Sequence, residues 1–242
     1  MRYATALRRL RVIAEECDEI SRLWDHPPAL VAAYAFGAVL EHPADLPPVQ
    51  PALVLDLPVE DLAWCTQPAP AARLASLLAL EKAPVDWYWR PTGLPVANHL
   101  IHRPLRIWTQ VGGGDGTALD ALARRAAEPL RLPPPDPRQE AEQLRAELAA
   151  SLAHLRRLEA AYWERDWRVA HRGSGVHPEN HLWDAVHGYL DLVLQGHLSV
   201  RPAAMPPADT FRRRADLQVF RDQHPSVPVV LVDAVRGATA LE

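Results

Sequence analysis

The stretch YAFGAVLEHPADLPPVQPALVLDLP, residues 34–58, decides the fold class. It begins inside Ala29–Leu40, a short apolar run interrupted by Gly37, and such a run indicates a buried strand. Residues 42–48 are rich in proline and form a loop, after which Val49–Leu57 is a second apolar strand. Two strands joined by so short a connection predict part of a small sheet.

The segments around this pair predict further helices and strands. Tyr3–Trp24 is a helix, because its apolar residues recur three and four positions apart, at Leu7, Leu10, Ile13, Cys17, Ile20 and Trp24. Two more helices are expected at Ala71–Glu81 and Thr117–Glu128, and two strands at Val85–Arg90 and Leu105–Gln110. The glycine-rich residues 111–116 lack the Gly-Lys-Ser/Thr ending of a phosphate-binding loop, which favours a plain turn there.

The composition changes after the proline-rich segment Leu130–Glu140. A long helix is expected from about Pro137 to Ala170, and a second helix at Asn180–Gln195, with Leu182, Val186, Tyr189 and Val193 facing inward. The predicted fold class is therefore α+β: a small mixed sheet with flanking helices, followed by a long antiparallel helical hairpin. We expect an α+β domain over residues 1–130 and a mainly helical domain over residues 137–242, with a further helix at Phe211–Asp222 and a strand at Val227–Val232.

Bulk properties exclude several classes of protein. The net charge of −4 gives no global basic footprint for nucleic acid, and no run of eighteen apolar residues predicts a membrane span. The two cysteines, Cys17 and Cys65, suggest no disulfide framework, so a reducing cytoplasmic location is expected. The single lysine among many arginines suggests a GC-rich bacterial genome. The expected partner is an unknown protein or a second copy of the chain.

A helix, a strand ending in Phe36-Gly37, a loop and an apolar strand together resemble the start of the nucleotidyltransferase superfamily. In that family the first strand ends in Gly-Ser, and the second carries two carboxylates, one residue apart, that hold two divalent cations. The resemblance places those carboxylates near Gln50 and Ala52, and Ala38 stands where the serine is expected. It therefore implies a frame without catalysis. The alternative is an unrelated α+β domain.

Two acidic residues remain near this predicted frame. Asp56 lies at the far end of the second strand, and Asp86 could be the third acid, which the family carries on a later strand. Asp86 alone cannot hold two magnesium ions, because such sites need several anionic oxygen ligands.

The helical half resembles the HEPN domains, helical bundles often encoded beside nucleotidyltransferases. Their ribonuclease members carry an arginine, four to six residues, and then a histidine, and the stretch RGSGVH matches that spacing. The resemblance implies that Arg172 and His177 are catalytic. The glycines between them predict a turn, however, whereas the family seats these residues at a helix.

The stretch from His171 to His187 is the densest in chemically active side chains. His177, His181 and Asp184 could bind zinc or another divalent transition metal, the only cofactor that we expect as possible. A histidine–carboxylate pair could also perform acid–base chemistry. In the alternative interpretation, Asn180 or a residue just before it caps the helix, and the histidines bond to loop carbonyls.

Three functions remain open from the sequence. The first is a non-catalytic protein that works by binding, which the missing carboxylates favour. The second is an enzyme, either a divergent nucleotidyltransferase or a metal-dependent hydrolase that uses His177, His181 and Asp184. The third is an HEPN-like ribonuclease that uses Arg172 and His177. The missing carboxylates favour the non-catalytic function over the two enzymatic ones.

Overall fold

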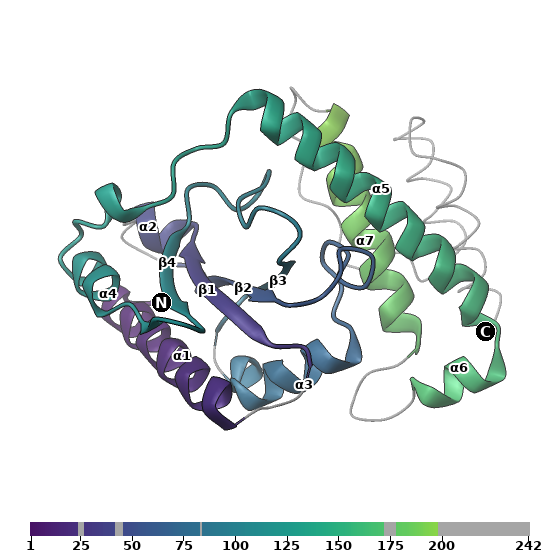
Figure 1. Cartoon of the computed structure of the whole chain (residues 1–242), viewed down its shortest axis with the longest axis horizontal. Coiled ribbons are helices and arrows are strands. Elements are labelled where there is room, and N and C mark those ends of the chain that lie inside the picture. The colour runs from purple at the N-terminus through teal and green to yellow at the C-terminus, as the bar shows by residue number, and fades with distance from the viewer. Residues whose placement is uncertain (24–26, 42–45, 83, 172–177, 198–242) are drawn as a thin grey trace. The chain divides into compact units, whose positions relative to one another are not determined.

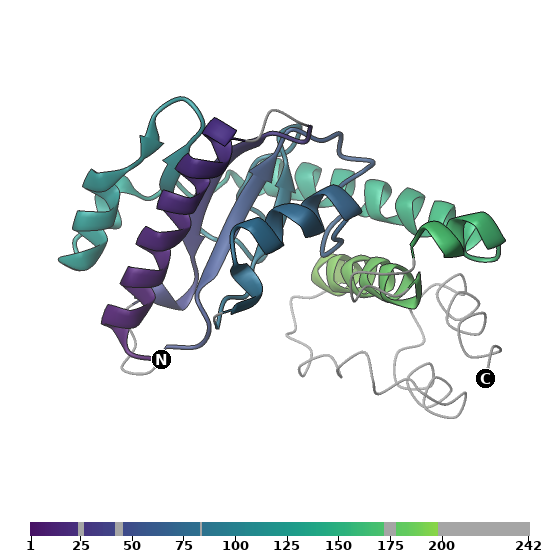
Figure 2. The same cartoon turned by 90° about the horizontal axis from the view of Figure 1, so that it is seen from below.

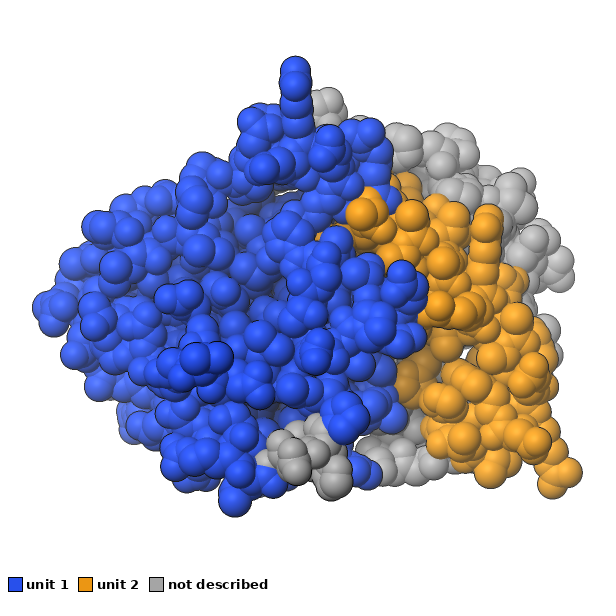
Figure 3. All heavy atoms as spheres, viewed as in Figure 1, with its two compact units in different colours: residues 1–62, 67–145 blue, residues 63–66, 146–242 orange. Residues whose placement is uncertain are grey.

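The computed structural model describes residues 1–23, 27–41, 46–82, 84–171 and 178–197. The chain forms two compact units (Figure 3). Unit 1 consists of residues 1–62 and 67–145, and unit 2 consists of residues 63–66 together with the chain from residue 146 onward. The two predicted strands around residues 34–58 both belong to unit 1.

Unit 1 is built on a five-stranded sheet in the order β3-β2-β1-β4-β5 (Figure 1). The strands are β1 (Leu30–Phe36), β2 (Gln50–Leu55), β3 (Tyr88–Pro91), β4 (Leu105–Thr109) and β5 (Gly113–Gly114). β1 runs antiparallel to β2 and β4, whereas β2 and β3 are parallel. The predicted small mixed sheet is therefore confirmed, with β1 at its centre.

Helices cover one face of this sheet. They are α1 (Tyr3–Leu23), α3 (Ala69–Leu77) and α4 (Gly116–Ala123), and the shorter elements of the unit are α2 (Ala38–Glu41), η1 (Leu80–Lys82) and η2 (Glu128–Leu130). Figures 1 and 2 show α1 and α3 on the same side of the strands. Leu10, Ile13 and Cys17 of α1 are fully buried in the core, so the predicted apolar face of this helix is confirmed. Trp24 lies outside the described residues.

The glycine-rich stretch forms a turn and a short edge strand rather than a phosphate loop. Gly113 has φ +68°, a conformation that glycine adopts without strain, and Asp115 caps α4 by accepting a hydrogen bond from Ala118 N at 2.9 Å. The prediction that α4 continues to Glu128 is wrong. Arg125 has φ +55°, and this left-handed residue ends the helix while its N–H donates to the Leu122 carbonyl.

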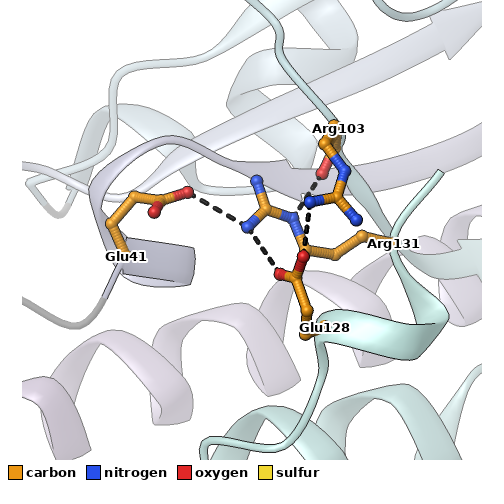
Figure 4. A network of polar contacts seen from close by, with 4 residues as sticks. All are labelled: Glu41, Arg103, Glu128 and Arg131. Carbon is orange, nitrogen blue, oxygen red and sulfur yellow. Dashed lines mark hydrogen bonds and ion pairs between the residues drawn. The ribbon is translucent and has the colours of Figure 1, made fainter. Parts of the chain in front are cut away.

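An ion-pair network fixes the chain after α4 (Figure 4). The largely buried Arg131 guanidinium lies 3.1 Å from a carboxylate oxygen of Glu41 and 3.1 Å from one of Glu128. Its Nε donates to the carbonyl of Arg103, whose own guanidinium pairs with Glu128. Each of these four charged side chains has a partner within the network, which explains how the chain is held after α4.

Unit 2 contains most of a long helix and two further helices. These are α5 (Pro137–Tyr162), of which the first nine residues belong to unit 1, α6 (Arg165–Ala170) and α7 (Pro178–His197). The prediction of one unbroken helix to Ala170 is wrong. The Glu164 N–H bonds to the Ala161 carbonyl in a tight turn, and the extended backbone of Glu164 (φ −75°, ψ 125°) then starts α6.

The helical hairpin is confirmed. α5 and α7 run antiparallel (Figure 1), and the four predicted inward residues of α7 are buried beside Leu155 and Tyr162 of α5. A segment from far away in the sequence joins this unit. Trp64 Nε1 donates to Asp191 Oδ2 of α7 at 2.6 Å, and Gly188 leaves room for the Trp64 backbone.

None of the described helices is long and apolar enough to cross a membrane. The helix expected at 211–222 and the strand expected at 227–232 lie outside the described residues.

Candidate functional site

Two places in the structure hold the residues that the sequence marks as candidates. The first is the face of the sheet that points away from α1, α3 and α4. Phe36 of β1 pairs with Gln50 of β2, and the parallel register that joins Ala52 to Tyr88 puts Asp86 level with Gln50. The Asp86 N–H also donates to the Val49 carbonyl at 2.8 Å. Phe36, Gln50 and Asp86 thus form one row across this face, next to Gly37.

Gln50 occupies the space above Gly37. Gly37 has φ +70°, and a Cβ built on it would lie 3.2 Å from the Gln50 side-chain carbon Cδ and closer still to Oε1. The missing side chain at Gly37 therefore lets the Gln50 amide approach the turn after β1. An uncharged amide stands here where the resemblance places a metal-binding carboxylate.

The next row contains Tyr34, Ala52 and Tyr88. Ala52 is fully buried between the two neighbouring strands, whereas both tyrosines are half-buried. The Tyr88 hydroxyl donates to Asp86 at 3.3 Å, and its ring meets Phe36 edge to face with centroids 5.6 Å apart. Burial raises the pKa of Tyr34, an effect that the nearby Arg106 guanidinium partly offsets. This row is aromatic and apolar.

No Asp or Glu stands on any of the strands β1 to β4. Asp56 follows the end of β2 and is exposed, and Asp86 precedes β3 and is exposed as well. Of the predicted acids, only Asp86 lies level with the Gly37 turn. One carboxylate beside an amide and two tyrosines can accept hydrogen bonds, but it supplies too few anionic ligands for a two-metal site.

The second place is a cluster of aromatic and imidazole rings in unit 2. His171, directly after α6, stacks on Trp167 with ring centroids 4.0 Å apart and planes inclined by 22°. His181 of α7 meets His171 edge to face at 5.1 Å and Trp167 at 6.3 Å. The structure therefore brings two of the predicted histidines together, and a tryptophan holds one of them in place.

The electrostatics of this cluster follow from burial. Burial lowers the pKa of His181, and the neighbouring His171 lowers it further, because a second positive charge would be repelled. Burial alone raises the pKa of Asp184 to about 6. His187 is exposed.

The remaining predicted site residues are not all described. Arg172 and His177 lie outside the described residues, so the proposed catalytic pair and the metal set of His177, His181 and Asp184 stay predictions. Among the residues that the structure does describe, no three His, Cys, Asp or Glu side chains gather closely enough to hold a metal ion.

Sequence reasoning missed the contact between Trp167 and His171. The signal was present, because the two residues are four positions apart at the end of a predicted helix, where side chains meet. It also missed the packing of Gln50 on Gly37, for which no local sequence signal exists.

Asp184 provides a prediction about pH. Because its pKa is raised in the folded state, its contribution to stability is fully present below about pH 4 and is lost as the pH rises through 6. We expect Asp184→Asn to melt like the unsubstituted chain at pH 4 and to be more stable by about 1–3 kcal/mol at pH 8. Thermal melts across this range test it, with the exposed Asp166→Asn as control. Equal melting temperatures of Asp184→Asn and the unsubstituted chain at pH 8 would contradict this prediction.

Comparison with known proteins identifies a family but no described activity. Neither the curated proteins nor the solved structures contain a significant match to this chain. The family described as "Domain of unknown function (DUF7711)" matches residues 1–197. The match spans the sheet and all three helices α5 to α7, and it ends at the last residue of α7. The chain therefore belongs to the DUF7711 family.

Proposed function

We propose that this protein is a non-catalytic, nucleotidyltransferase-like protein that works by binding a protein partner or a second copy of itself, and that it acts in the cytoplasm. The observation that carries the proposal is the absence of acidic residues from strands β1 to β4. Nucleotidyl transfer by two metal ions needs carboxylates that bridge the cations and align the attacking hydroxyl with the triphosphate.

The local packing supports this interpretation. The Gln50 amide occupies the space above Gly37, and Ala52 is fully buried, so neither position offers an anionic oxygen. The resemblance expects a helix and a strand before the Gly37 turn, and a second strand and a further acid after it. The chain has this order, with α1 and β1 before the turn and β2 and Asp86 after it. What remains beside the Gly37 turn is an amide, one carboxylate and two half-buried tyrosines, a set that can make contacts but cannot hold two metal ions.

A turnover assay tests the absence of catalysis. The full chain is incubated with the four ribonucleoside triphosphates and Mg²⁺ or Mn²⁺, and pyrophosphate release is followed. We expect release no faster than in a protein-free control, and no change in Asp86→Asn or in the matched exposed variant Asp56→Asn. Pyrophosphate release that disappears in Asp86→Asn and persists in Asp56→Asn would overturn the proposal.

Mass measurement separates the two kinds of binding. Light scattering across a concentration series distinguishes self-association, in which the mass rises to a multiple of 26.9 kDa, from a chain that stays monomeric and needs another partner.

The second candidate is an enzyme built on the stretch from His171 to His187, either a metal-dependent hydrolase or an HEPN-like ribonuclease. The observation that favours it is the pair of imidazoles from His171 and His181, whose ring centroids lie 5.1 Å apart. Cleavage of a model phosphodiester and of single-stranded RNA tests it, with Arg172→Ala, His177→Ala, His181→Ala and Asp184→Asn compared. Activity lost in Arg172→Ala and His177→Ala would indicate the ribonuclease, whereas metal-dependent activity lost in His181→Ala and Asp184→Asn would indicate the hydrolase.

A further inference from the structure

We propose that four exposed arginines of α1 and α4 form a docking surface for an acidic peptide segment of a partner protein. These residues, which we call the basic patch, are Arg8, Arg11, Arg124 and Arg125. The inference rests on the binding function proposed above and adds the surface and the chemistry of the partner. It is supported by how the two helices meet, by the lack of acidic partners for three of the arginines, and by their positions along the helices.

The two helices that carry the basic patch lie side by side and run in opposite directions (Figures 1 and 2). At the start of α1, the Tyr3 hydroxyl donates to the Leu122 carbonyl near the end of α4 at 2.7 Å. Further along α1, the Arg11 guanidinium pairs with Asp120 at 2.8 Å. Arg8 is exposed and lies one helical turn before Arg11, so these two side chains are neighbours. The first half of α1 and the end of α4 therefore contribute to one surface.

Packing holds the arginines at the end of α4 in position. Arg125 has φ +55°, and its guanidinium carbon lies 5.0 Å from the centre of the Tyr3 ring, which is a cation–π contact. Arg124 ends α4, and its N–H donates to the Asp120 carbonyl at 3.1 Å. Because the backbone of both residues and the guanidinium of Arg125 are already ordered, less conformational entropy is lost when a ligand binds.

Three of the four guanidinium groups have no acidic partner. Within the part of the chain that the structure describes, no carboxylate forms an ion pair with Arg8, Arg124 or Arg125. Arg11 is the exception, because it pairs with Asp120. The basic patch therefore carries a surplus of positive charge, although the net charge of the chain is −4.

Helix stability accounts for only part of the basic patch. The dipole of a helix favours cations near the C-terminus, which explains Arg124 at the end of α4. It does not explain Arg8 and Arg11, which lie in the first half of α1. Arg9, between them, donates to the Ala79 carbonyl at 2.6 Å and so has a role within the fold. Arg8 makes no such contact with the described residues, which indicates a role outside the fold.

The size of the basic patch favours an acidic peptide over nucleic acid. A guanidinium group binds a carboxylate through two parallel hydrogen bonds, so each unpaired arginine can hold one Asp or Glu side chain. Binding to nucleic acid uses a longer basic track, with on the order of 6–10 phosphate contacts, and often aromatic rings that stack on bases. The aromatic ring beside the patch, that of Tyr3, already contacts Arg125.

Fluorescence anisotropy of the full chain with a labelled peptide of about ten glutamates tests the docking surface. We expect the peptide to bind at about 50 mM NaCl and to be released at about 500 mM, because salt screens exposed charges. Arg8→Glu combined with Arg124→Glu should weaken the affinity about tenfold or more. The matched control is Arg22→Glu combined with Arg138→Glu. It changes the net charge equally at exposed arginines outside the patch and should change the affinity by no more than about twofold.

Absence of peptide binding, or an equal loss in the matched control, would overturn the proposal. Tighter binding of a single-stranded RNA of about ten nucleotides, at the same salt, would overturn the choice of an acidic peptide as the partner. If the charge reversal fails to fold, as circular dichroism would show, Arg8→Ala combined with Arg124→Ala decides the result. The pyrophosphate and mass measurements test the binding function separately, so a failed peptide titration would remove the docking surface and leave that function standing.

Discussion

Gly188→Ala is expected to destabilise unit 2 by about 3 kcal/mol or more. In the interior of an exposed helix, the same substitution stabilises a protein by about 1 kcal/mol, because alanine is the better helix former. The sign reverses here because a Cβ on Gly188 would lie 2.8 Å from the carbonyl carbon of Trp64 and closer still to its oxygen. Backbone atoms cannot move aside cheaply, so either α7 or residues 63–66 must shift.

Unfolding of the full chain by urea, followed by circular dichroism, measures this effect. The matched control is Gly116→Ala in α4, where a built Cβ meets nothing within 4 Å and no loss of stability is expected. A Gly188→Ala chain as stable as the unsubstituted one would show that residues 63–66 do not pack on α7 as described.

Ala52→Asp is expected to cost about 3 kcal/mol or more at pH 7. This substitution introduces an acid at a position where the nucleotidyltransferase resemblance leads one to expect a carboxylate. Ala52 is fully buried, so the new carboxylate would lose its hydration, and its pKa would rise. The cost should therefore grow as the pH rises and shrink in acid, where the group takes up a proton.

Ala52→Asn is the matched control, because asparagine has nearly the same volume without the charge. The difference in unfolding free energy between the two variants, measured from pH 4 to pH 8, isolates the charge. If Ala52→Asp is as stable as Ala52→Asn at pH 8, the position is open to solvent. If Ala52→Asp also gains pyrophosphate release with Mg²⁺, the frame can still support transfer, which would count against the binding proposal.

The order of elements could be predicted because it depends on local patterns. The apolar spacing of α1 and the inward residues of α7 follow a helical period, and the structure buries them as expected. Helix ends were less predictable. The left-handed Arg125 ends α4, and the tight turn at Glu164 separates α5 from α6, yet neither segment contains the glycine or proline that usually signals such an end.

The candidate sites, too, could be predicted from the sequence only in part. The absence of acids from the sheet could be inferred at Gln50 and Ala52, because it concerns which residues are present. The contact between His171 and His181 joins the ends of two helices, and the predicted spacing along one helix favoured His181 and Asp184 instead. Periodicity describes one element at a time and so gives no distance between two of them.

By itself, the sequence determined that this is an α+β protein with a mixed sheet, a helical hairpin and no paired carboxylates on the expected strand. Those properties follow from residue identity and hydrophobic period. Only the tertiary structure decided that Gln50 packs on Gly37, that residues 63–66 join α7 at Gly188, and that Trp167 orients His171 toward His181. Each of these contacts joins residues of different helices, strands or loops. Such contacts are determined by how the elements pack against one another, whereas the hydrophobic pattern of the sequence describes only a single element.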